Sequence, residues 1–226
     1  SAGGNRMATA KGSSTLTVGG VGMINAGGKV MMKAPKISFT VAGVAMELRY
    51  VPSEAESEIA VFLPAQKILL SAEVVQDHTF PNIYTIRGAR YRDPIRWVAS
   101  LDLLRQWDAE AMVLQHGPPV LGKQAVAHAL TVYRDEIQFV HDQTIRYMNK
   151  GLAPDEIAEV VKLPPQLDGE HPWGRQYYGT VKHSVRNIYN GNVGWFAGDP
   201  VELEPTPRVE YARRLVALMG GRQAVL

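Results

Sequence analysis

The sequence of 226 residues contains no cysteine. This excludes disulfide bonds, thiolate metal sites and cysteine nucleophiles, and it fits a reducing or an oxidising compartment. Long hydrophobic runs are also missing, because no apolar stretch is long enough to span a bilayer. The first residues, SAGGNRMATAKGSS, lack the apolar centre of a signal peptide. The formal net charge is only +2, so charge alone suggests neither nucleic acid nor an anionic membrane as a partner.

Residues 15 to about 71 have the pattern of short strands separated by turns. The candidate strands are residues 29–33, 37–41, 45–50, 58–63 and 67–71, divided by glycine-rich or polar pieces. A long irregular stretch, QDHTFPNIYTIRGARYRD, follows, and a loop of this length inside a compact domain is often functional. Asp93 and Pro94 then predict the start of a helix. Residues 111–115 predict one more strand, which stops at His116.

From about Lys123 the pattern becomes helical and predicts one long helix that ends at Gly151. Its seam of side chains three or four residues apart is Val126, Leu130, Tyr133, Ile137, Val140, Thr144 and Tyr147. At 1.5 Å per residue this helix would be about 42 Å long, and a seam of that length usually meets another long helix. Shorter helices are predicted within residues 153–165, 177–190 and 206–221, the last with Thr206 as its cap. The sequence therefore predicts an α/β domain, residues 1–121, followed by an all-α domain, residues 122–226.

Glu73 is set in an apolar run, KILLSAEVV, where burying an unpaired carboxylate is costly. Its partner could be a basic side chain, a backbone donor or a metal ion. Glu54 and His116 also lie where predicted strands end or loops begin, and the ends of adjacent strands in an α/β layer tend to open into one crevice. Two carboxylates and an imidazole meeting there would suit zinc or manganese. The alternative is a surface acid at Glu54, a paired acid at Glu73 and a strand-end histidine at His116.

The irregular loop contributes Asn82, Arg87 and Arg92. Two arginines and an asparagine on one loop could bind a tetrahedral oxyanion through charged, forked hydrogen bonds. The alternative is that the arginines form surface ion pairs, for example with Asp93. Weaker candidates for a functional role are His78, His128, His141 and His183. Tyr189 follows the apolar face of its helix and could face a site or pack in the core.

Several blocks of the sequence, in this order, resemble the alkyl sulfatases of the metallo-β-lactamase superfamily. They are SEAESEIAVFLPAQKILLSAEVV, HTFPNIYTIRGARYRD, HGPPVLG, YRDEIQFVHDQTIRYMNKGLAPDEIAEVVKLP, QYYGTVKHSVRNIYNGNVGWFAGDP and PRVEYARRLVALMGG. The resemblance runs from about residue 18 to the last residues. It implies the C-terminal portion of a metallo-β-lactamase αββα sandwich, followed by an all-α dimerisation domain that pairs two subunits.

Enzymes of this family bind two zinc ions, and the resemblance implies that Glu54, Glu73 and His116 are metal ligands. The partner of Glu73 would then be a dication. Gly117 stands where the family has the second of two adjacent histidines. The family's His-x-His-x-Asp-His motif, which supplies the other ligands, is absent from the sequence. We therefore expect an internal or C-terminal piece of a longer enzyme, completed by an N-terminal chain or segment that carries this motif.

The family hydrolyses alkyl sulfate esters to an alcohol and sulfate. The resemblance implies that Asn82, Arg87 and Arg92 bind the sulfate group, together with Tyr189 from the helical domain. Apolar helix faces near the cleft would accept the alkyl tail. We expect little or no hydrolysis by this chain alone, a homodimer formed through the helical domain, and a periplasmic or secreted location rather than a cytoplasmic one.

Two other functions stay open from the sequence. The first is a non-catalytic dimerisation or scaffold fragment, which the absent histidine motif favours for this chain in isolation. The second is a different hydrolase of the same superfamily that acts on a phosphate or a lactone. The arginine loop favours sulfate over a lactone, because a lactone needs no clamp for an oxyanion. The metal-ligand candidates favour the sulfatase for the complete protein, since a scaffold has no need of them.

Overall fold

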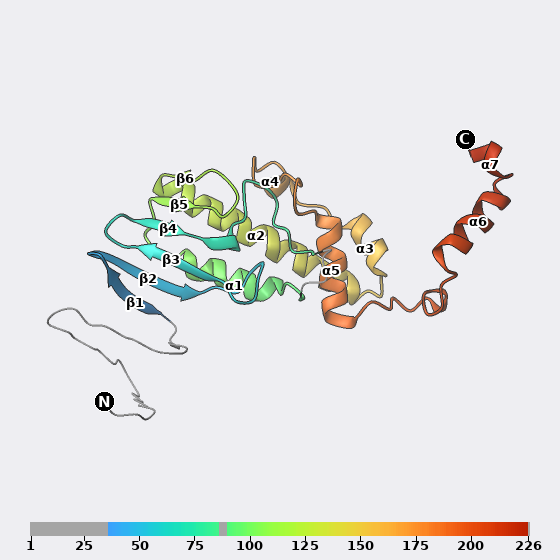
Figure 1. Cartoon of the computed structure of the whole chain (residues 1–226), viewed down its shortest axis with the longest axis horizontal. Coiled ribbons are helices and arrows are strands. Elements are labelled where there is room, and N and C mark those ends of the chain that lie inside the picture. The colour runs from blue at the N-terminus through green and yellow to red at the C-terminus, as the bar shows by residue number, and fades with distance from the viewer. Residues whose placement is uncertain (1–35, 86–89, 226) are drawn as a thin grey trace, which may run out of the picture. The chain divides into compact units, whose positions relative to one another are not determined.

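A computed structural model describes residues 36–85 and 90–225, which all belong to one compact unit, Ala34–Leu226. A six-stranded sheet follows the order of the chain (Figure 1). Its strands are β1 (Ile37–Val41), β2 (Val44–Tyr50), β3 (Ile59–Leu63), β4 (Ile68–Leu70), β5 (Ala111–Val113) and β6 (Val120–Leu121). Neighbouring strands are antiparallel except β4 and β5, which are parallel. The predicted strands within the described residues are confirmed apart from small shifts of their bounds. β6 was not predicted. The strand expected at residues 29–33 lies outside the described residues.

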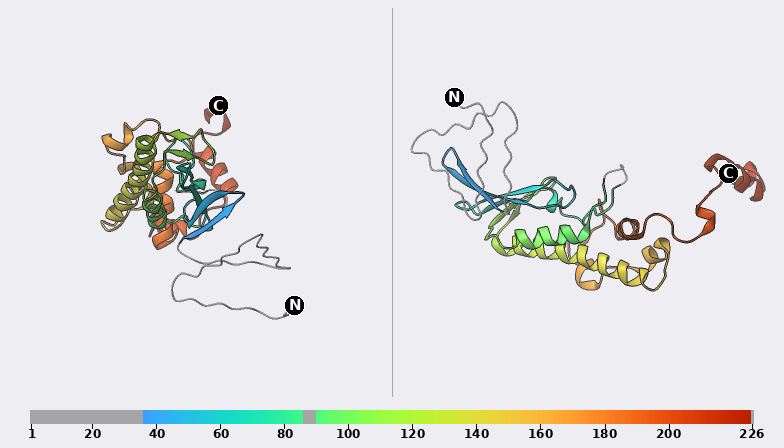
Figure 2. Two further views of the ribbon diagram at one scale, coloured as in Figure 1. Left: turned by 90° about the vertical axis from the view of Figure 1, so that its left-hand side faces the viewer. Right: turned by 90° about the horizontal axis from the view of Figure 1, so that it is seen from below.

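Two helices cover one face of this sheet, as Figure 2 shows. The first, α1 (Pro94–Leu104), begins after Asp93, whose carboxylate accepts hydrogen bonds from two backbone N–H groups of the first turn. This confirms the predicted cap and satisfies donors that a helix start otherwise leaves unpaired. The helix buries Trp97, Leu101 and Leu104 against the sheet and α2.

The second helix, α2 (Lys123–Met148), is the long helix that the sequence predicts. Six of the seven seam residues are buried and Tyr147 is half-buried. Within the described residues, the seam does not pack against another long helix as expected. It packs against two shorter helices, α1 and α5 (Val181–Val193), because a short helix on each half of α2 covers the seam as well as one long helix does.

The remaining helical segments are η1 (Ala72–Val74), α3 (Pro154–Val160), α4 (Pro165–Asp168), η2 (Pro200–Glu202), α6 (Arg208–Leu218) and α7 (Arg222–Val225). The predicted cap of α6 is wrong: Pro207 occupies that position, without a side-chain hydrogen bond, and Thr206 lies before it. None of the described helices combines the length and apolar character needed to cross a membrane. Because α2 contacts both β6 and α1, packing continues across residue 121, and the predicted domain boundary there stays a prediction.

The two faces of the sheet differ in burial. The face under α1 and α2 carries Ala60, Phe62, Leu69, Met112 and Val120, which are all buried. Direct strand partners share a face, so the opposite face carries Ile59, Val61, Leu63, Ile68, Leu70, Ala111, Val113 and Leu121. These eight side chains are apolar, yet each is exposed or only half-buried. We call them the open sheet face.

Candidate functional site

Strand direction brings the predicted ligands to one edge of the sheet. β2 and β4 are both antiparallel to β3, and β5 is parallel to β4, so the C-terminal ends of β2, β4 and β5 lie at the same edge. Glu54, Glu73 and His116 follow these three ends. A pocket of about 630 Å³ opens here and is lined by both glutamates and by Arg92. The two glutamates therefore line one crevice, whereas His116 is not among its lining residues.

Glu73 and His116 are in direct contact. His116 Nε2 lies 2.7 Å from Glu73 Oε1, and both side chains are partly exposed. The partner of Glu73 in this structure is thus an imidazole. Gly117, which stands in place of a family histidine, leaves room for Asp77: a Cβ atom at residue 117 would lie 2.1 Å from Asp77 Oδ1. A histidine at residue 117 would therefore require Asp77 to move.

Glu54 is more deeply buried, with 8% of its side chain exposed. Its Oε1 atom accepts hydrogen bonds from Arg92 and from the Tyr178 hydroxyl, the latter at 3.2 Å. Its Oε2 atom accepts a hydrogen bond from the side-chain amide of Gln76. The alternative of a solvated surface acid at Glu54 is therefore wrong.

Gln76 connects Glu54 to the helical part of the chain. The fully buried Tyr133 of α2 donates a hydrogen bond to Gln76 Oε1 at 3.1 Å, and the backbone N–H of Asn82 donates to the same atom at 2.8 Å. With its amide nitrogen on Glu54, Gln76 uses both ends of its side chain. This arrangement fixes the carboxylate of Glu54 relative to α2.

Arg92 is 8% exposed, so the alternative of a surface ion pair is wrong for this residue. Besides binding Glu54, its guanidinium donates to the backbone carbonyls of Asn82 and Tyr84. Its Nε atom is buried without a hydrogen-bond partner. Asn82 takes part through its backbone, while Arg87 lies outside the described residues. The structure thus brings Arg92 and Asn82 together beside Glu54.

Glu58 is a member of this site that the sequence reasoning missed. It precedes β3, which begins at the same edge of the sheet, and it accepts hydrogen bonds from the Ser53 hydroxyl and from the backbone N–H of Ala55. Burial raises the pKa of Glu58 to about 8, and the negative charges of Glu73 and Glu54 add to this shift. Three carboxyl groups therefore crowd one pocket edge. The sequence signal that could have identified Glu58 is its position directly before β3, which begins at this edge of the sheet.

Tyr178 was also missed as a site residue, because it falls within the helix predicted for residues 177–190. It lies before α5, whose cap is Thr180, and its hydroxyl reaches Glu54. Tyr189, the tyrosine expected to bind sulfate, is buried on α5 and does not line the pocket. Its role stays a prediction.

The four weaker histidine candidates lie elsewhere. His78 stacks on Trp173, and His183 lies near the Tyr84 ring. His128 pairs with Glu170, and His141 pairs with its neighbour in sequence, Asp142. None of these histidines lines the pocket beside Glu54.

The donor types at the sheet edge fit a zinc ion, which takes imidazole nitrogen and carboxylate oxygen. Glu73 and His116 lie next to each other, and a dication beside them would favour the ionised form of the nearby Glu58 carboxyl group. In residues 36–85 and 90–225, however, no three His, Cys, Asp or Glu side chains are grouped so that they could hold an ion. The residues therefore fit part of a metal site and not a complete one.

Comparisons with known proteins agree with this picture. A family model described as alkyl sulfatase dimerisation matches residues 153–226. A linear primary-alkylsulfatase of Pseudomonas sp. is 57% identical over 187 residues, which cover 83% of this chain and 35% of that protein. An alkyl/aryl-sulfatase of Saccharomyces cerevisiae is 36% identical over 92% of this chain and 33% of its own length. The structure of the sec-alkylsulfatase Pisa1 from Pseudomonas sp. matches with a TM-score of 0.80 and 35% identity, over 87% of this chain and 31% of that one.

Over most of its length, the chain is similar to alkylsulfatases. This confirms the resemblance found in the sequence, and the match to Pisa1 confirms the α/β part followed by helices. The chain spans about a third of the length of the alkylsulfatases it matches. The alkyl sulfatase dimerisation model covers α3 to α7 and also the segment that carries Tyr178.

Proposed function

We propose that this chain is part of a zinc-dependent alkyl sulfatase that hydrolyses alkyl sulfate esters to an alcohol and sulfate. The observation that carries the proposal is the meeting of Glu73 and His116 beside Glu54 and Arg92 at one edge of the sheet, in a chain whose relatives are alkylsulfatases. A scaffold without catalysis has no need of this arrangement. The relatives' names favour sulfate esters over a phosphate or a lactone.

In this proposal Glu73, His116 and Glu54 contribute to holding zinc. Zinc held by these residues would supply Lewis-acid chemistry that lowers the pKa of water toward about 7, so that hydroxide would be available at neutral pH. Arg92 lines the pocket, so its positive charge would attract the sulfate group and stabilise negative charge on the leaving sulfate. Asn82 fixes Arg92 through its carbonyl oxygen.

We further propose that a segment outside this chain completes the site and carries the His-x-His-x-Asp-His motif. Two observations support this. The described residues offer no complete group of metal ligands. The open sheet face exposes a continuous apolar surface, which a soluble protein rarely leaves uncovered, and a second sheet stacked about 10 Å away would cover it.

The test compares the chain alone with the chain mixed with the part of the 57% identical relative that precedes the matched segment. We expect no sulfate release from dodecyl sulfate by the chain alone, and zinc-dependent release by the mixture. Changing Glu73→Gln or His116→Ala in this chain should return the mixture to the background rate. The exposed Gln223→Asp variant of α7 serves as the control and should remain active.

Two results would contradict the proposal in different ways. Full hydrolysis by the chain alone, with two zinc ions bound, would show that no completing segment is needed. Undiminished activity of the mixture with both Glu73→Gln and His116→Ala would show that these residues are not ligands. Zinc content is measured by elemental analysis, and turnover by the sulfate formed.

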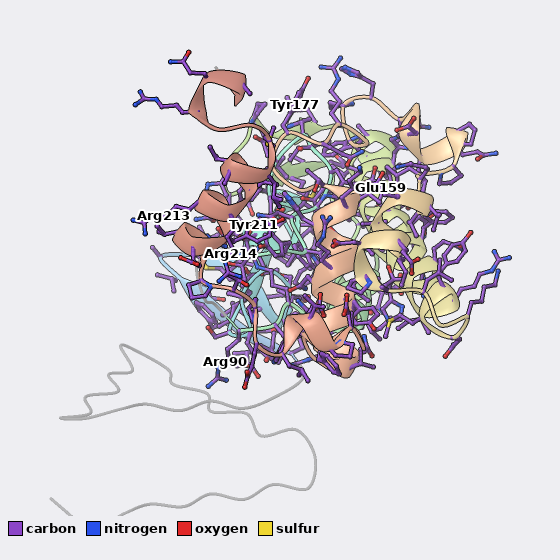
Figure 3. The ribbon with its side chains drawn as sticks, turned by 90° about the vertical axis from the view of Figure 1, so that its right-hand side faces the viewer. Arg90, Glu159, Tyr177, Tyr211, Arg213 and Arg214 are labelled. Carbon is purple, nitrogen blue, oxygen red and sulfur yellow. The ribbon has the colours of Figure 1, made fainter. Side chains whose placement is uncertain are left out.

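We propose that the helical part forms a homodimer and that α6 lies in its interface. α6 has no buried residue, and Tyr211, Leu215 and Leu218 are exposed. In Figure 3 Tyr211 projects from this helix, as do Arg213 and Arg214. An apolar helix surface of this kind suits a second copy, and residues 153–226 match the dimerisation model.

Replacing Leu215 and Leu218 together by aspartate is expected to convert the dimer to a monomer. Two charges would then have to be buried in an apolar contact, which costs several kcal/mol. Sedimentation equilibrium measures the change. Gln223→Asp adds a charge to α7 without removing an apolar side chain and should leave the dimer intact. A dimer that survives the double substitution places the interface elsewhere.

A further inference from the structure

Tyr91 is the one aromatic side chain among the described residues that line the pocket beside Glu54. The aliphatic residues that line it, Pro52 and Ala55, are small, and the other lining residues are polar or charged. Tyr91 is 41% exposed, so part of its ring is open to solvent. An apolar group that enters the pocket would therefore make its main contact with this ring.

Gly191 of α5 fixes the position of the ring. A Cβ atom at residue 191 would lie 2.1 Å from Cε2 and 2.3 Å from Cζ of Tyr91. One edge of the ring therefore rests on the backbone of the helix, and the absence of a side chain at Gly191 permits this close approach. The ring is thus held against α5 although 100 positions separate the two residues in the sequence.

α5 has no other apolar surface to offer this pocket. Its apolar face consists of Val181, Val185 and Ile188, which are all buried in the core. None of these three residues lines the pocket. The helix therefore contributes to the pocket by supporting the ring of Tyr91.

The tyrosine hydroxyl brings no negative charge into the pocket. Burial raises the pKa of Tyr91 to about 12, and the negative charge of Asp93 adds to the shift, so the phenol stays neutral at physiological pH. Arg92, the residue proposed to attract the sulfate group, follows Tyr91 in the sequence and lines the same pocket. A neutral ring beside a cationic side chain suits a ligand with an apolar tail and an anionic headgroup.

We infer that the ring of Tyr91, supported by Gly191, is the subsite that contacts the alkyl tail of the ester and of the alcohol product. The inference rests on the proposed function and names the residue that recognises the hydrocarbon part of the substrate. Both residues belong to this chain, and the contact needs no metal ion. The subsite can therefore be tested on the chain as it stands.

The experiment titrates the full chain, with ¹³C-labelled tyrosine rings, with 1-hexanol and follows the ring signals by NMR. This alcohol has a tail but no sulfate, so its binding depends neither on zinc nor on the headgroup site. The signal of Tyr91, identified by its loss in Tyr91→Phe, is expected to shift and to saturate. Tyr177 is the internal control: it is exposed, lies outside the pocket and is labelled in Figure 3, so its signal should stay in place.

Gly191→Ala tests the support of the ring without altering Tyr91. The added methyl group would displace the ring, while alanine favours the helix more than glycine does, so the chain should stay folded. We expect hexanol to bind about 4-fold more weakly, the change that corresponds to losing the burial of one methylene group. Asn190→Ala changes the adjacent exposed position of the same helix and should bind hexanol as the wild type does.

A Tyr91 signal that moves no more than that of Tyr177 would contradict the inference, and unchanged hexanol affinity of Gly191→Ala would contradict the supporting role of this glycine. Sulfate release by the completed mixture tests the proposed function separately. Release without a response of Tyr91 would place the tail elsewhere and leave the sulfatase intact. A saturable shift of Tyr91 without release would leave the apolar subsite standing while the proposed function falls.

Discussion

Replacing Arg92 by alanine is expected to lower the free energy of unfolding by about 3 to 5 kcal/mol. Arg92 and Glu54 form an ion pair in which 9% and 8% of the side chains are exposed. Removing one partner of a buried pair leaves the other charge uncompensated, and such losses fall in the range of about 3 to 5 kcal/mol. The carbonyls of Asn82 and Tyr84 lose a donor as well. Urea unfolding at pH 7 measures the change.

Arg90→Ala is the matched control for this prediction. Arg90 pairs with Glu56 at 2.8 Å, but 87% of its side chain is exposed and it projects outward in Figure 3. An exposed pair of this kind contributes little to stability, because solvent screens it. Adding Glu54→Gln to Arg92→Ala should recover part of the loss, because no buried charge is then left alone. Equal effects of Arg90→Ala and Arg92→Ala would contradict the assignment of a buried pair.

The free energy of unfolding is expected to fall as the pH rises. Replacing Glu136 by glutamine should make this fall much smaller. Glu136 lies on α2, is fully buried, and neither carboxylate oxygen has a hydrogen-bond partner. Burial raises the pKa of Glu136 to about 9, with a contribution from the negative charge of Glu170. Between pH 4.5 and 9 the folded chain therefore keeps a proton that the unfolded chain has released, and the free energy of unfolding falls as pH rises. At about 1.4 kcal/mol per pH unit, the loss between pH 5 and pH 8 is about 4 kcal/mol.

The prediction is tested by measuring the free energy of unfolding at pH 5 and at pH 8 and comparing the two values. Glu136→Gln should show a clearly smaller difference than the wild type, while the exposed Glu204→Gln should behave as the wild type does. A residual slope is expected, because the raised pKa of Glu58 acts with the same sign up to about pH 8. An unchanged slope in Glu136→Gln would show that this carboxyl group is ionised or solvated in the folded chain.

Local sequence signals were sufficient for most elements of the fold. Asp93 followed by Pro94 marks the start of α1 because a carboxylate cap and a proline suit the same end of a helix. The seam of α2 comprises seven residues at helical spacing, so the buried face of the helix could be predicted directly from the sequence. β6 was missed because two residues, Val120 and Leu121, are too few to show an alternating pattern.

The site was predictable only in part. Glu54, Glu73 and His116 could be chosen because they end strands, and strand direction explains why they meet. The contact between Tyr178 and Glu54 left no local signal, since it depends on the path of the chain between α4 and α5. The burial that raises the pKa of Glu58, and the neighbouring carboxyl groups that add to the shift, likewise appear only once three strands lie side by side.

The open sheet face affects how binding of alkyl sulfates must be measured. These esters are surfactants, and the exposed side chains of Ile59, Leu70, Val113 and Leu121 offer them an apolar surface. Adsorption to this surface would deplete the surfactant from solution and could unfold the chain without a bond being broken. Disappearance of the ester therefore cannot stand for catalysis, and a short-chain ester below its micelle concentration is the better ligand.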